Sequence, residues 1–422
     1  MYNRRQLLTR LGATAATGIG VGILPRWARA QVANDQVVLA VFLRGAADAA
    51  SIVFPTPGSS PARQKYEAWR SATGTRITTT TMALGHGLSL HPAFRPLRAA
   101  VNAGHLSFIP GVANAVMNRS HFRAMDLVES GSGDEMPRAD GVLARAWTSL
   151  QGGTPAAGLG AVALNATLPY SLQRRGAPAV TAPAFASFGT LPSRQFRPDV
   201  DATLSARLAR LYVPGSGSCT PSSLFCSSGQ QGSATVDALG GLIAASSLNG
   251  NLGHDLVDVL SRDTQRQIKF MTIDLGGWDS HNDQGNENAG ALKDNLDGLV
   301  SLLSSIYQHA NATGVMSRLT VVVMSEFGRT TFENGTAGTD HGYGSMAMVM
   351  SHGLTGRLVG GDAWFPSSGS GAFYDSAENL NVLPRALEHR QVYAEVLSRK
   401  LGLTDLATVL PGFTPAPSRI FA

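Results

Sequence analysis

Short apolar runs that end in polar loops recur along the chain and predict the strands of a sheet. Residues 36–43 (QVVLAVFL) are apolar at successive positions, which is typical of a strand buried on both faces of a parallel sheet. Gly, Pro and charged residues separate the runs, as expected at turns. The runs cover residues 36–43, 106–112, 160–164, 269–275, 319–324 and 345–351.

A segment between two of these runs has the spacing of an amphipathic helix. Within residues 288–310, apolar side chains recur every three or four positions and fall on one helical face. They are Leu292, Leu296, Leu299, Leu302, Leu303 and Ile306. A strand, a helix and a strand in succession form a parallel unit. Further helical patterns lie at 94–102, 200–212, 251–267 and 385–401. We therefore predict an α/β fold with a doubly wound, mostly parallel sheet flanked by helices.

Length and composition suit one large domain. The chain has 422 residues, of which 43% are hydrophobic and 15% charged, which is enough for a large core. Pieces punctuated by Pro and Gly, followed by a Ser/Gly-rich loop at 216–233, predict an insertion or cap at about 134–260. We expect a single domain over residues 31–422.

The first 30 residues have the features of an export signal. Arg4 and Arg5 precede a mild apolar stretch, and Ala28–Arg29–Ala30 forms a small-x-small cleavage site before Gln31. These features predict a twin-arginine signal peptide, and hence a periplasmic or extracellular protein. An ordinary secretory signal or a short membrane anchor is the alternative. No later window has the ~20 apolar residues of a transmembrane helix.

Charge and cysteine content limit the classes of partner and of metal site that the chain can have. The formal charge of +5 comes in part from the N-terminal arginines, and no stripe of Lys and Arg with interleaved aromatics follows, which argues against a nucleic-acid partner. Cys219 and Cys226 lie in a Ser-rich loop. In an exported protein they form a disulfide or remain two free thiols. Two cysteines are too few for a metal site made of Cys alone.

Acidic residues and histidines follow several predicted strands. Because the carboxyl ends of parallel strands meet at one edge of the sheet, where ligands bind in open α/β folds, we expect these residues to form one site. The candidate ligands are Asp48, Asp279, His281, Glu326, Asp340 and His341. Carboxylates and imidazoles together suit zinc, manganese or another divalent ion.

A metal at this edge would polarise an ester oxygen and lower the pKa of a hydroxyl or water. Arg329 would clamp a phosphate or sulfate, or would simply neutralise Glu326. Asp48 is also placed to cap a helix. The alternative for the whole set is a group of buried ion pairs and caps with no metal.

Three further residues have two interpretations each. Ser120 lies where a loop enters a helix, so it is either an N-cap or a nucleophile held beside the metal near the helix dipole. His86 and His91 are either structural or part of the site.

The motifs, taken in order, resemble the family called domain of unknown function 1501, which consists of exported proteins and is itself similar to the alkaline phosphatase and sulfatase superfamily. The matching residues span most of the mature chain. They are Leu43–Asp48 (LRGAAD), Arg119–Phe122 (RSHF), Gly277–His281 (GWDSH), Ser325–Thr330 (SEFGRT) and Gly338–Gly342 (GTDHG).

The resemblance implies an alkaline phosphatase-like fold with metal at the carboxyl edge of the sheet. Asp279, His281 and His341 would match the ligands of one metal, and Asp48 and Glu326 those of a second. Ser120 would match the superfamily's hydroxyl nucleophile, and Arg44 or Arg329 would hold the anion.

The implied function is an exported metal-dependent hydrolase of phosphate or sulfate esters, acting on a small-molecule or polymer substrate. A non-catalytic envelope protein that keeps the fold for binding or assembly is the alternative. The chain departs from phosphatases by having Glu326–Phe327 where they place Asp–His, and Ser120 lies in no sulfatase-type Cys/Ser-x-Pro-x-Arg motif.

Overall fold

The structure is a computed structural model that describes residues 35–152, 159–174, 177, 179–182, 184–185, 224–360 and 381–422. The predicted signal peptide, the predicted helix at 200–212 and Cys219 lie outside the described residues. The signal, that helix and the disulfide therefore stay predictions.

An eight-stranded sheet forms the centre of the domain, with the strand order β11-β5-β10-β9-β1-β8-β6-β7. Every strand runs parallel to the others except β10, which is antiparallel to both of its neighbours. The strands are β1 (Val37–Leu43), β5 (Leu106–Ala113), β6 (Ala161–Ala163), β7 (Ala179–Thr181), β8 (Phe270–Leu275), β9 (Leu319–Ser325), β10 (Ser345–Met350) and β11 (Leu387–Glu388). The predicted mostly parallel sheet is confirmed.

Register aligns the ends of the three central strands. Leu43 at the end of β1 pairs with Leu275 of β8 on one side and with Ser325 of β9 on the other. The loops that follow these strands therefore leave the sheet side by side at its carboxyl edge.

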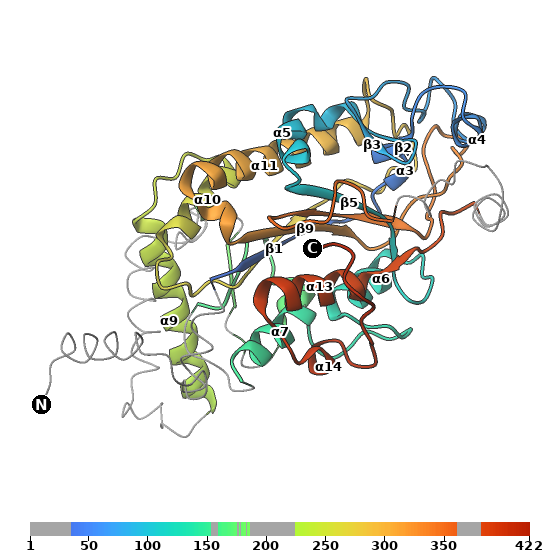
Figure 1. Ribbon diagram of the computed structural model, residues 1–422. Coiled ribbons are helices and arrows are strands. Elements are labelled where there is room, and N and C mark those ends of the chain that lie inside the picture. Colours follow the sequence, from blue (N-terminus) through green and yellow to red (C-terminus); the bar gives the residue numbers. More distant parts are fainter. Residues whose placement is uncertain are drawn as a thin grey trace, which may run out of the picture. The chain divides into compact units, whose positions relative to one another are not determined.

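Helices cover both faces of the sheet (Figure 1). On one face lie α10 (Leu252–Arg262), α11 (Ala291–Thr313), α5 (Arg98–Asn102) and the 3₁₀ helix η1 (Pro92–Leu97). On the other lie α6 (His121–Ser130), α7 (Val142–Leu150), α13 (His389–Leu401) and α14 (Leu406–Val409). This arrangement confirms the doubly wound α/β architecture.

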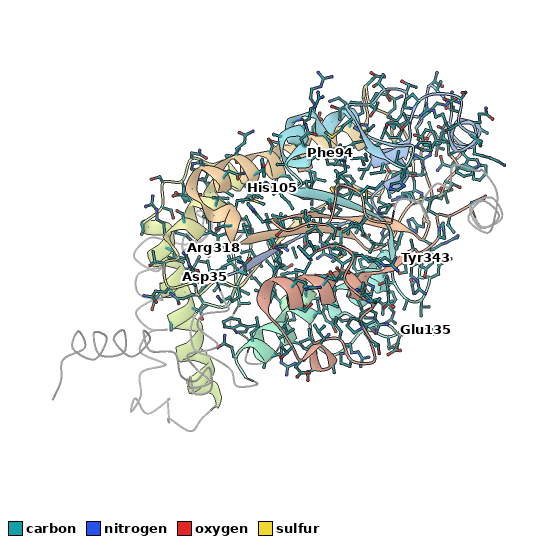
Figure 2. The ribbon with its side chains drawn as sticks, viewed as in Figure 1. Asp35, Phe94, His105, Glu135, Arg318 and Tyr343 are labelled. Atoms are coloured by element: carbon teal, nitrogen blue, oxygen red, sulfur yellow. The ribbon has the colours of Figure 1, made fainter. Side chains whose placement is uncertain are left out.

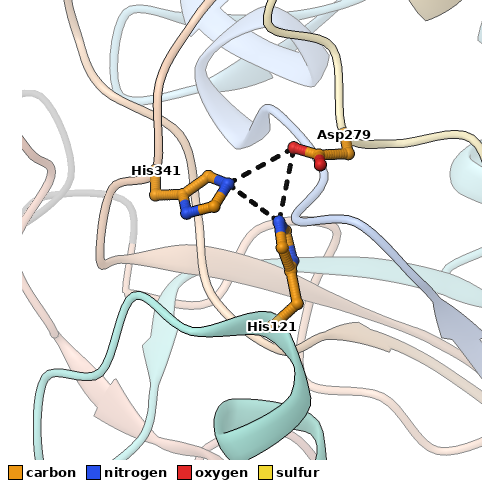
Figure 3. Close-up of side chains that lie close together, drawn as sticks. All are labelled: His121, Asp279 and His341. Carbon is orange, nitrogen blue, oxygen red and sulfur yellow. Dashed lines mark hydrogen bonds and ion pairs between the residues drawn. The ribbon is translucent and has the colours of Figure 1, made fainter.

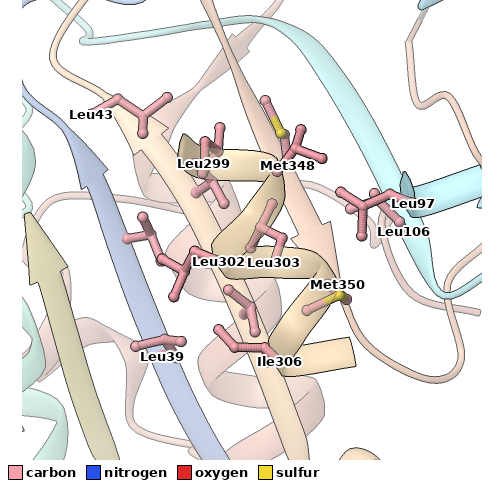
Figure 4. Packing of buried hydrophobic residues seen from close by; sticks show 14 of the residues in the cluster. Leu39, Leu43, Leu97, Leu106, Leu299, Leu302, Leu303, Ile306, Met348 and Met350 are labelled. Carbon is pink, nitrogen blue, oxygen red and sulfur yellow. The ribbon is translucent and has the colours of Figure 1, made fainter. Parts of the chain in front are cut away.

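Successive side chains of β1 point to opposite faces of the sheet and belong to two separate hydrophobic cores. Leu39 and Leu43 pack with the α11 face, whereas Val38 and Phe42 belong to the cluster under α7 and α13. Figure 4 shows Leu299, Leu302, Leu303 and Ile306 of α11 lying over the sheet, with Met348 and Met350 of β10 beside them. Phe94 of η1, which is labelled in Figure 2, meets Phe108 of β5 edge to face, with ring centroids 5.4 Å apart.

The remaining elements join the sheet to its helices. A three-stranded sheet of order β2-β4-β3 was not predicted, because its strands have only three or four residues each. The elements are α3 (Ala49–Ile52), β2 (Val53–Pro55), α4 (Pro61–Trp69), β3 (Met82–Gly85), β4 (Leu88–Leu90), η2 (Tyr170–Leu172), α9 (Leu224–Ala244) and η4 (Val315–Ser317). No helix in the described ranges combines the length and apolar character needed to cross a membrane.

Several predicted boundaries differ from the structure. The Ser/Gly-rich segment predicted as a loop at 216–233 is helical from Leu224, where α9 begins. The helix predicted at 251–267 ends at Arg262, because the Asp263 carboxylate accepts hydrogen bonds from the backbone N–H groups of Gln267 and Ile268 and turns the chain toward β8. The region predicted as an insertion, 134–260, supplies α7 on one face and the edge strands β6 and β7.

Candidate metal centre

Three side chains from separate loops meet at the carboxyl edge of the sheet (Figure 3). His121 begins α6, Asp279 follows β8, and His341 lies in the loop between β9 and β10. The Nε2 atoms of His121 and His341 are 2.8 Å apart. Asp279 Oδ1 lies 3.3 Å from the first Nε2 and 3.4 Å from the second. The two imidazoles and the carboxylate thus form a small triangle of atoms of the kind that bind metal ions.

His281 joins two corners of this triangle. Its Nε2 lies 2.9 Å from His341 Nε2 and 3.0 Å from Asp279 Oδ1. The sequence-predicted ligands Asp279, His281 and His341 are therefore brought together, with His121 as an additional member.

In each of the three imidazoles, the hydrogen-bond partner of Nδ1 determines which ring nitrogen carries the proton. His121 Nδ1 lies 2.7 Å from Glu326 Oε1, His281 Nδ1 lies 2.9 Å from Asp340 Oδ1, and His341 Nδ1 lies 2.8 Å from the Arg119 carbonyl oxygen. Carbonyl and carboxylate oxygens accept hydrogen bonds, so each neutral ring carries its proton on Nδ1. Its Nε2 then presents a lone pair, as in metal-ligating histidines.

This convergence fits a cation. Lone pairs on three neighbouring nitrogens, beside a carboxylate oxygen, repel one another unless a proton or a metal ion lies between them. A tetrahedral ion with ligands at ~2.0–2.1 Å holds its ligand atoms about 3.3 Å apart. The contacts from Asp279 Oδ1, at 3.0 to 3.4 Å, are close to that spacing. Nitrogen and oxygen donors in this ratio suit zinc.

Charge also favours a divalent cation. The carboxylates of Asp279, Glu326 and Asp340 lie within the cluster, and among the described residues the one guanidinium that contacts any of them is that of Arg329. Burial raises the pKa of Asp279, but the hydrogen bond and charge of Arg329 outweigh it and hold the pKa at about 2. The hydrogen bond from His281 lowers the pKa of Asp340. Both carboxylates are therefore ionised at neutral pH.

The histidine pKa values shift in opposite directions. The hydrogen bond to Glu326 raises the pKa of His121, whereas burial lowers the pKa of His341. A metal that binds His121 displaces whatever proton its Nε2 carries, so metal binding and proton release are coupled.

Arg329 ties the loops of the site together. Its side chain is buried and donates to the carbonyl oxygens of Gly45, Ala46 and Thr339 at 2.6 to 2.9 Å. It also donates to Asp279 Oδ1. Since these partners occupy its donors, the predicted role as an anion clamp is not supported. The carboxylate that it neutralises is Asp279, rather than Glu326 as the sequence suggested.

Glu326 contacts a ligand ring. It is fully buried, and its Oε1 accepts from the backbone N–H of Gly45 at 2.8 Å as well as from His121. The Phe327 ring stacks on His121 with centroids 4.9 Å apart. The predicted assignment of Glu326 as a ligand of a second metal is thus corrected: Glu326 and Phe327 orient His121. Asp340 holds His281 in the same way.

Asp48 lies outside the cluster. Its carboxylate is buried in an ion pair with Arg70, at 2.5 and 3.0 Å, and also accepts from Ser51 and Gln284 at 2.7 Å. The predicted metal-ligand role is not supported because both oxygens are engaged elsewhere. The N-cap alternative is not supported either, since Asp48 makes no side-chain capping bond to α3. Gln284 connects it to the site by binding Ser280 and Thr339.

Arg44 is also committed to other residues. Its guanidinium lies 3.1 Å from Glu129 and 2.7 Å from Asp274. These two carboxylates neutralise Arg44, so the predicted role in holding a substrate anion is not supported.

Ser120 directly precedes His121. It occupies the N-cap position of α6 without making a side-chain capping bond, and its side chain is exposed. The capping interpretation is therefore not supported, and the hydroxyl is available for chemistry. His86 lies exposed in the β3–β4 turn, and His91 is buried, where its Nδ1 accepts from the backbone N–H of Ala93 at 3.1 Å. Neither belongs to the cluster.

His121 is the functional candidate that the sequence interpretation missed. It lies in the RSHF motif, directly after Ser120, which is the residue of that motif with a predicted role. A histidine at the start of a helix after β5 carries no strand-end signal of the kind that marked Asp279 and His281. Only the fold brings it beside them.

Glycines allow the loops of the site to touch. Gly45 has a φ of +117°, and a Cβ there would lie 2.5 Å from the backbone nitrogen of Asp279. A Cβ at Gly338 would lie 2.1 Å from the His281 carbonyl oxygen. Any side chain at these two positions would push the ligand loops apart.

Replacing Glu326 with glutamine is expected to weaken zinc binding by about 10- to 100-fold, as for other partners that orient a ligating histidine. The amide lacks the charge that polarises the His121 ring. Competition titration against a chromophoric zinc chelator measures the affinity. Glu135→Gln, at an exposed carboxylate, is the matched control. Unchanged affinity in Glu326→Gln would refute the orienting role.

Comparison with known proteins finds a family model that matches the C-terminal part of the chain. Residues 259–411 match the family model described as "Protein of unknown function (DUF1501)". The match includes Asp279, His281 and His341, but it begins beyond His121 in the chain. It confirms the resemblance drawn from the motifs. No curated protein matches the chain.

Several solved structures resemble the chain at low identity and with low TM-scores. The protein Ps i-CgsB, solved with k-i-k-neocarrahexaose, is 9% identical, with a TM-score of 0.35 over 89% of this chain and 74% of that one. The alkaline phosphatase of the Antarctic bacterium TAB5 is 10% identical, with a TM-score of 0.32 over 88% and 99%. The lipoteichoic acid synthase of Listeria monocytogenes is 10% identical, with a TM-score of 0.30 over 83% and 73%. At these scores the likeness carries no argument about function.

Proposed function

We propose that this chain, whose residues 259–411 match the DUF1501 family, is an exported metal-dependent hydrolase of phosphate or sulfate esters. One observation supports the proposal above all others. The Nε2 atoms of His121 and His341 converge with a carboxylate oxygen of Asp279 at the carboxyl edge of the sheet, and His281 Nε2 lies beside two of these three atoms. Each imidazole is oriented through Nδ1 by an oxygen acceptor. Metal sites for hydrolysis are built in this way.

His121, Asp279 and His341 would hold the ion, with His281 as the fourth ligand. Zinc is the first candidate because imidazole predominates, and manganese is the second. When bound, such an ion polarises an ester oxygen and lowers the pKa of a nearby water or hydroxyl. Asp279 is kept ionised by Arg329, and Glu326 and Asp340 keep two rings in the ligating tautomer.

Ser120 is the candidate nucleophile. Its hydroxyl is exposed, precedes the ligand His121 and lies at the N-terminus of α6. The helix dipole there favours the negative charge that develops as a phosphate or sulfate ester is attacked. A water in the same place is the other candidate, and Ser120→Ala separates the two. Loss of turnover with metal retained assigns attack to the serine, and retained turnover assigns it to water.

A non-catalytic binding protein is the second candidate function. Glu326 and Phe327 occupy the position where phosphatases place Asp–His, and here both are used to orient His121. Within the described residues a single candidate metal cluster is found. A one-metal site suits either a hydrolase or a protein that uses metal to hold a ligand.

The test is turnover by protein of known metal content. Zinc and manganese are measured by elemental mass spectrometry, and hydrolysis of p-nitrophenyl phosphate and p-nitrophenyl sulfate is then followed. The proposal expects turnover that chelation abolishes and that one equivalent of metal restores. Bound metal without turnover on either ester class would favour the binding protein.

Export by the twin-arginine route is proposed from the sequence alone. Replacing Arg4 and Arg5 together with lysine is expected to leave the precursor in the cytoplasm, because the paired arginines are what the export machinery reads. Fractionation of cells expressing the full chain measures this. Arg10→Lys is the control, and periplasmic protein in the paired variant would contradict the route.

A further inference from the structure

The segment Met117–Arg123 combines apolar and basic side chains next to a ligand. His121 lies within it, and the Arg119 carbonyl oxygen accepts from His341 Nδ1, so its backbone supports two corners of the cluster. Tyr343, labelled in Figure 2, anchors the chain just before it by donating to the Asn114 carbonyl oxygen at 2.8 Å.

Phe122 is the most exposed large apolar side chain in the part of the chain that the structure describes. It is 82% exposed, and Met117 in the same segment is 41% exposed. Phe122 directly follows His121 in the chain, so the Cα atoms of the two residues are about 3.8 Å apart. Small-molecule sites are lined mainly by apolar and aromatic side chains, and Phe122 offers such a surface next in the chain to His121.

Arg119 and Arg123 flank the same ligand. Within the described residues, neither guanidinium makes a hydrogen bond or an ion pair, and Arg119 is exposed. Arginine at the start of a helix is disfavoured by the dipole, and α6 has no acidic residue in its first turn to offset it. Arg44 and Arg329, by contrast, are committed to protein partners. Arg119 and Arg123 are therefore the guanidiniums near the cluster that remain available to an anion.

We propose that the segment Met117–Arg123 selects the substrate. Arg119 and Arg123 hold the anionic group at the metal, and Phe122 packs against an apolar group on the ester. The substrate class is thus an anionic ester that carries an aryl or alkyl group, in preference to a small polar one. This inference rests on the proposed function, because it takes the metal cluster as the place where the anion binds.

The test measures binding and needs no turnover. Phenylphosphonate and methylphosphonate carry the same anionic group with and without a large apolar group. Isothermal titration of the zinc-loaded protein with each gives their affinity ratio. The wild type is expected to bind phenylphosphonate about tenfold more tightly, from partial burial of two apolar surfaces. Phe122→Ser removes this preference, keeps zinc content and leaves methylphosphonate affinity unchanged.

Two comparisons complete the test. Met136→Ser removes another exposed apolar side chain, 63% exposed and outside the segment, and is expected to keep the preference. Arg119→Gln with Arg123→Gln is expected to weaken both phosphonates alike. The inference is overturned if the preference survives in Phe122→Ser, if the wild type shows none, or if neither phosphonate binds. Failure of the proposed function shows separately, as absence of ester hydrolysis by the same zinc-loaded protein.

Discussion

His341→Ala is expected to abolish stoichiometric zinc binding. His341 Nε2 is the atom that the other two imidazoles share, at 2.8 and 2.9 Å, so its removal leaves His121 and His281 connected only through Asp279. The loss of affinity should exceed the roughly 10- to 100-fold that follows from losing an orienting partner. Competition with a chromophoric chelator measures it directly.

The same variant should lose the stabilisation that metal gives to the folded state. An ion present at 100 times its Kd stabilises the protein by about 2.7 kcal/mol, which appears as a zinc-dependent rise in melting temperature. His341→Ala should show no such rise, whereas His86→Ala, at an exposed histidine outside the cluster, should retain it. If the His341→Ala variant bound zinc as tightly as the wild type, His341 would not be a ligand of the site.

Asp48→Ala is expected to destabilise the fold by about 3–5 kcal/mol, because it leaves the Arg70 guanidinium buried without its carboxylate. Both side chains are almost wholly inaccessible to solvent. Urea denaturation followed by circular dichroism measures the loss. Asp297→Ala, which removes a partner of Lys293 on the surface of α11, is the control and should change little.

Two further measurements distinguish a buried ion pair from simple packing. Asp48→Ala combined with Arg70→Met should recover part of the lost stability, because the unpaired charge is removed. Burial raises the pKa of Asp48, but the charge of Arg70 outweighs it and the net shift is downward. The pair therefore stabilises the protein fully above the unfolded pKa of about 3.9, and that stability is lost as pH falls further. An Asp48→Ala protein as stable as wild type would contradict the account of this pair.

The sheet was predictable because its strands are strongly apolar and its turns are marked. The run at 269–275 and the leucine spacing after it fixed β8 and α11 closely. The convergence of Asp279 and His341 followed from one physical rule, that parallel strands end at the same edge. Register between β1, β8 and β9 bears this out.

The roles of the individual carboxylates could not be predicted. Asp48, Glu326 and Asp279 all follow buried strands, yet one meets Arg70, one meets His121 and one joins the cluster. A carboxylate at a strand end looks the same in sequence whatever it faces, because its partner comes from a distant segment. For the same reason His121, supplied by the start of α6, was overlooked.

X-ray absorption spectroscopy of the zinc-loaded protein, with anomalous diffraction to place the ion, tests the central claim most directly. The account predicts one zinc bounded by imidazole nitrogens of His121, His281 and His341 and by an oxygen of Asp279, at about 2.0–2.1 Å. A zinc held elsewhere, a ligand set that lacks His121, or no bound ion in protein recovered from its native compartment would contradict it.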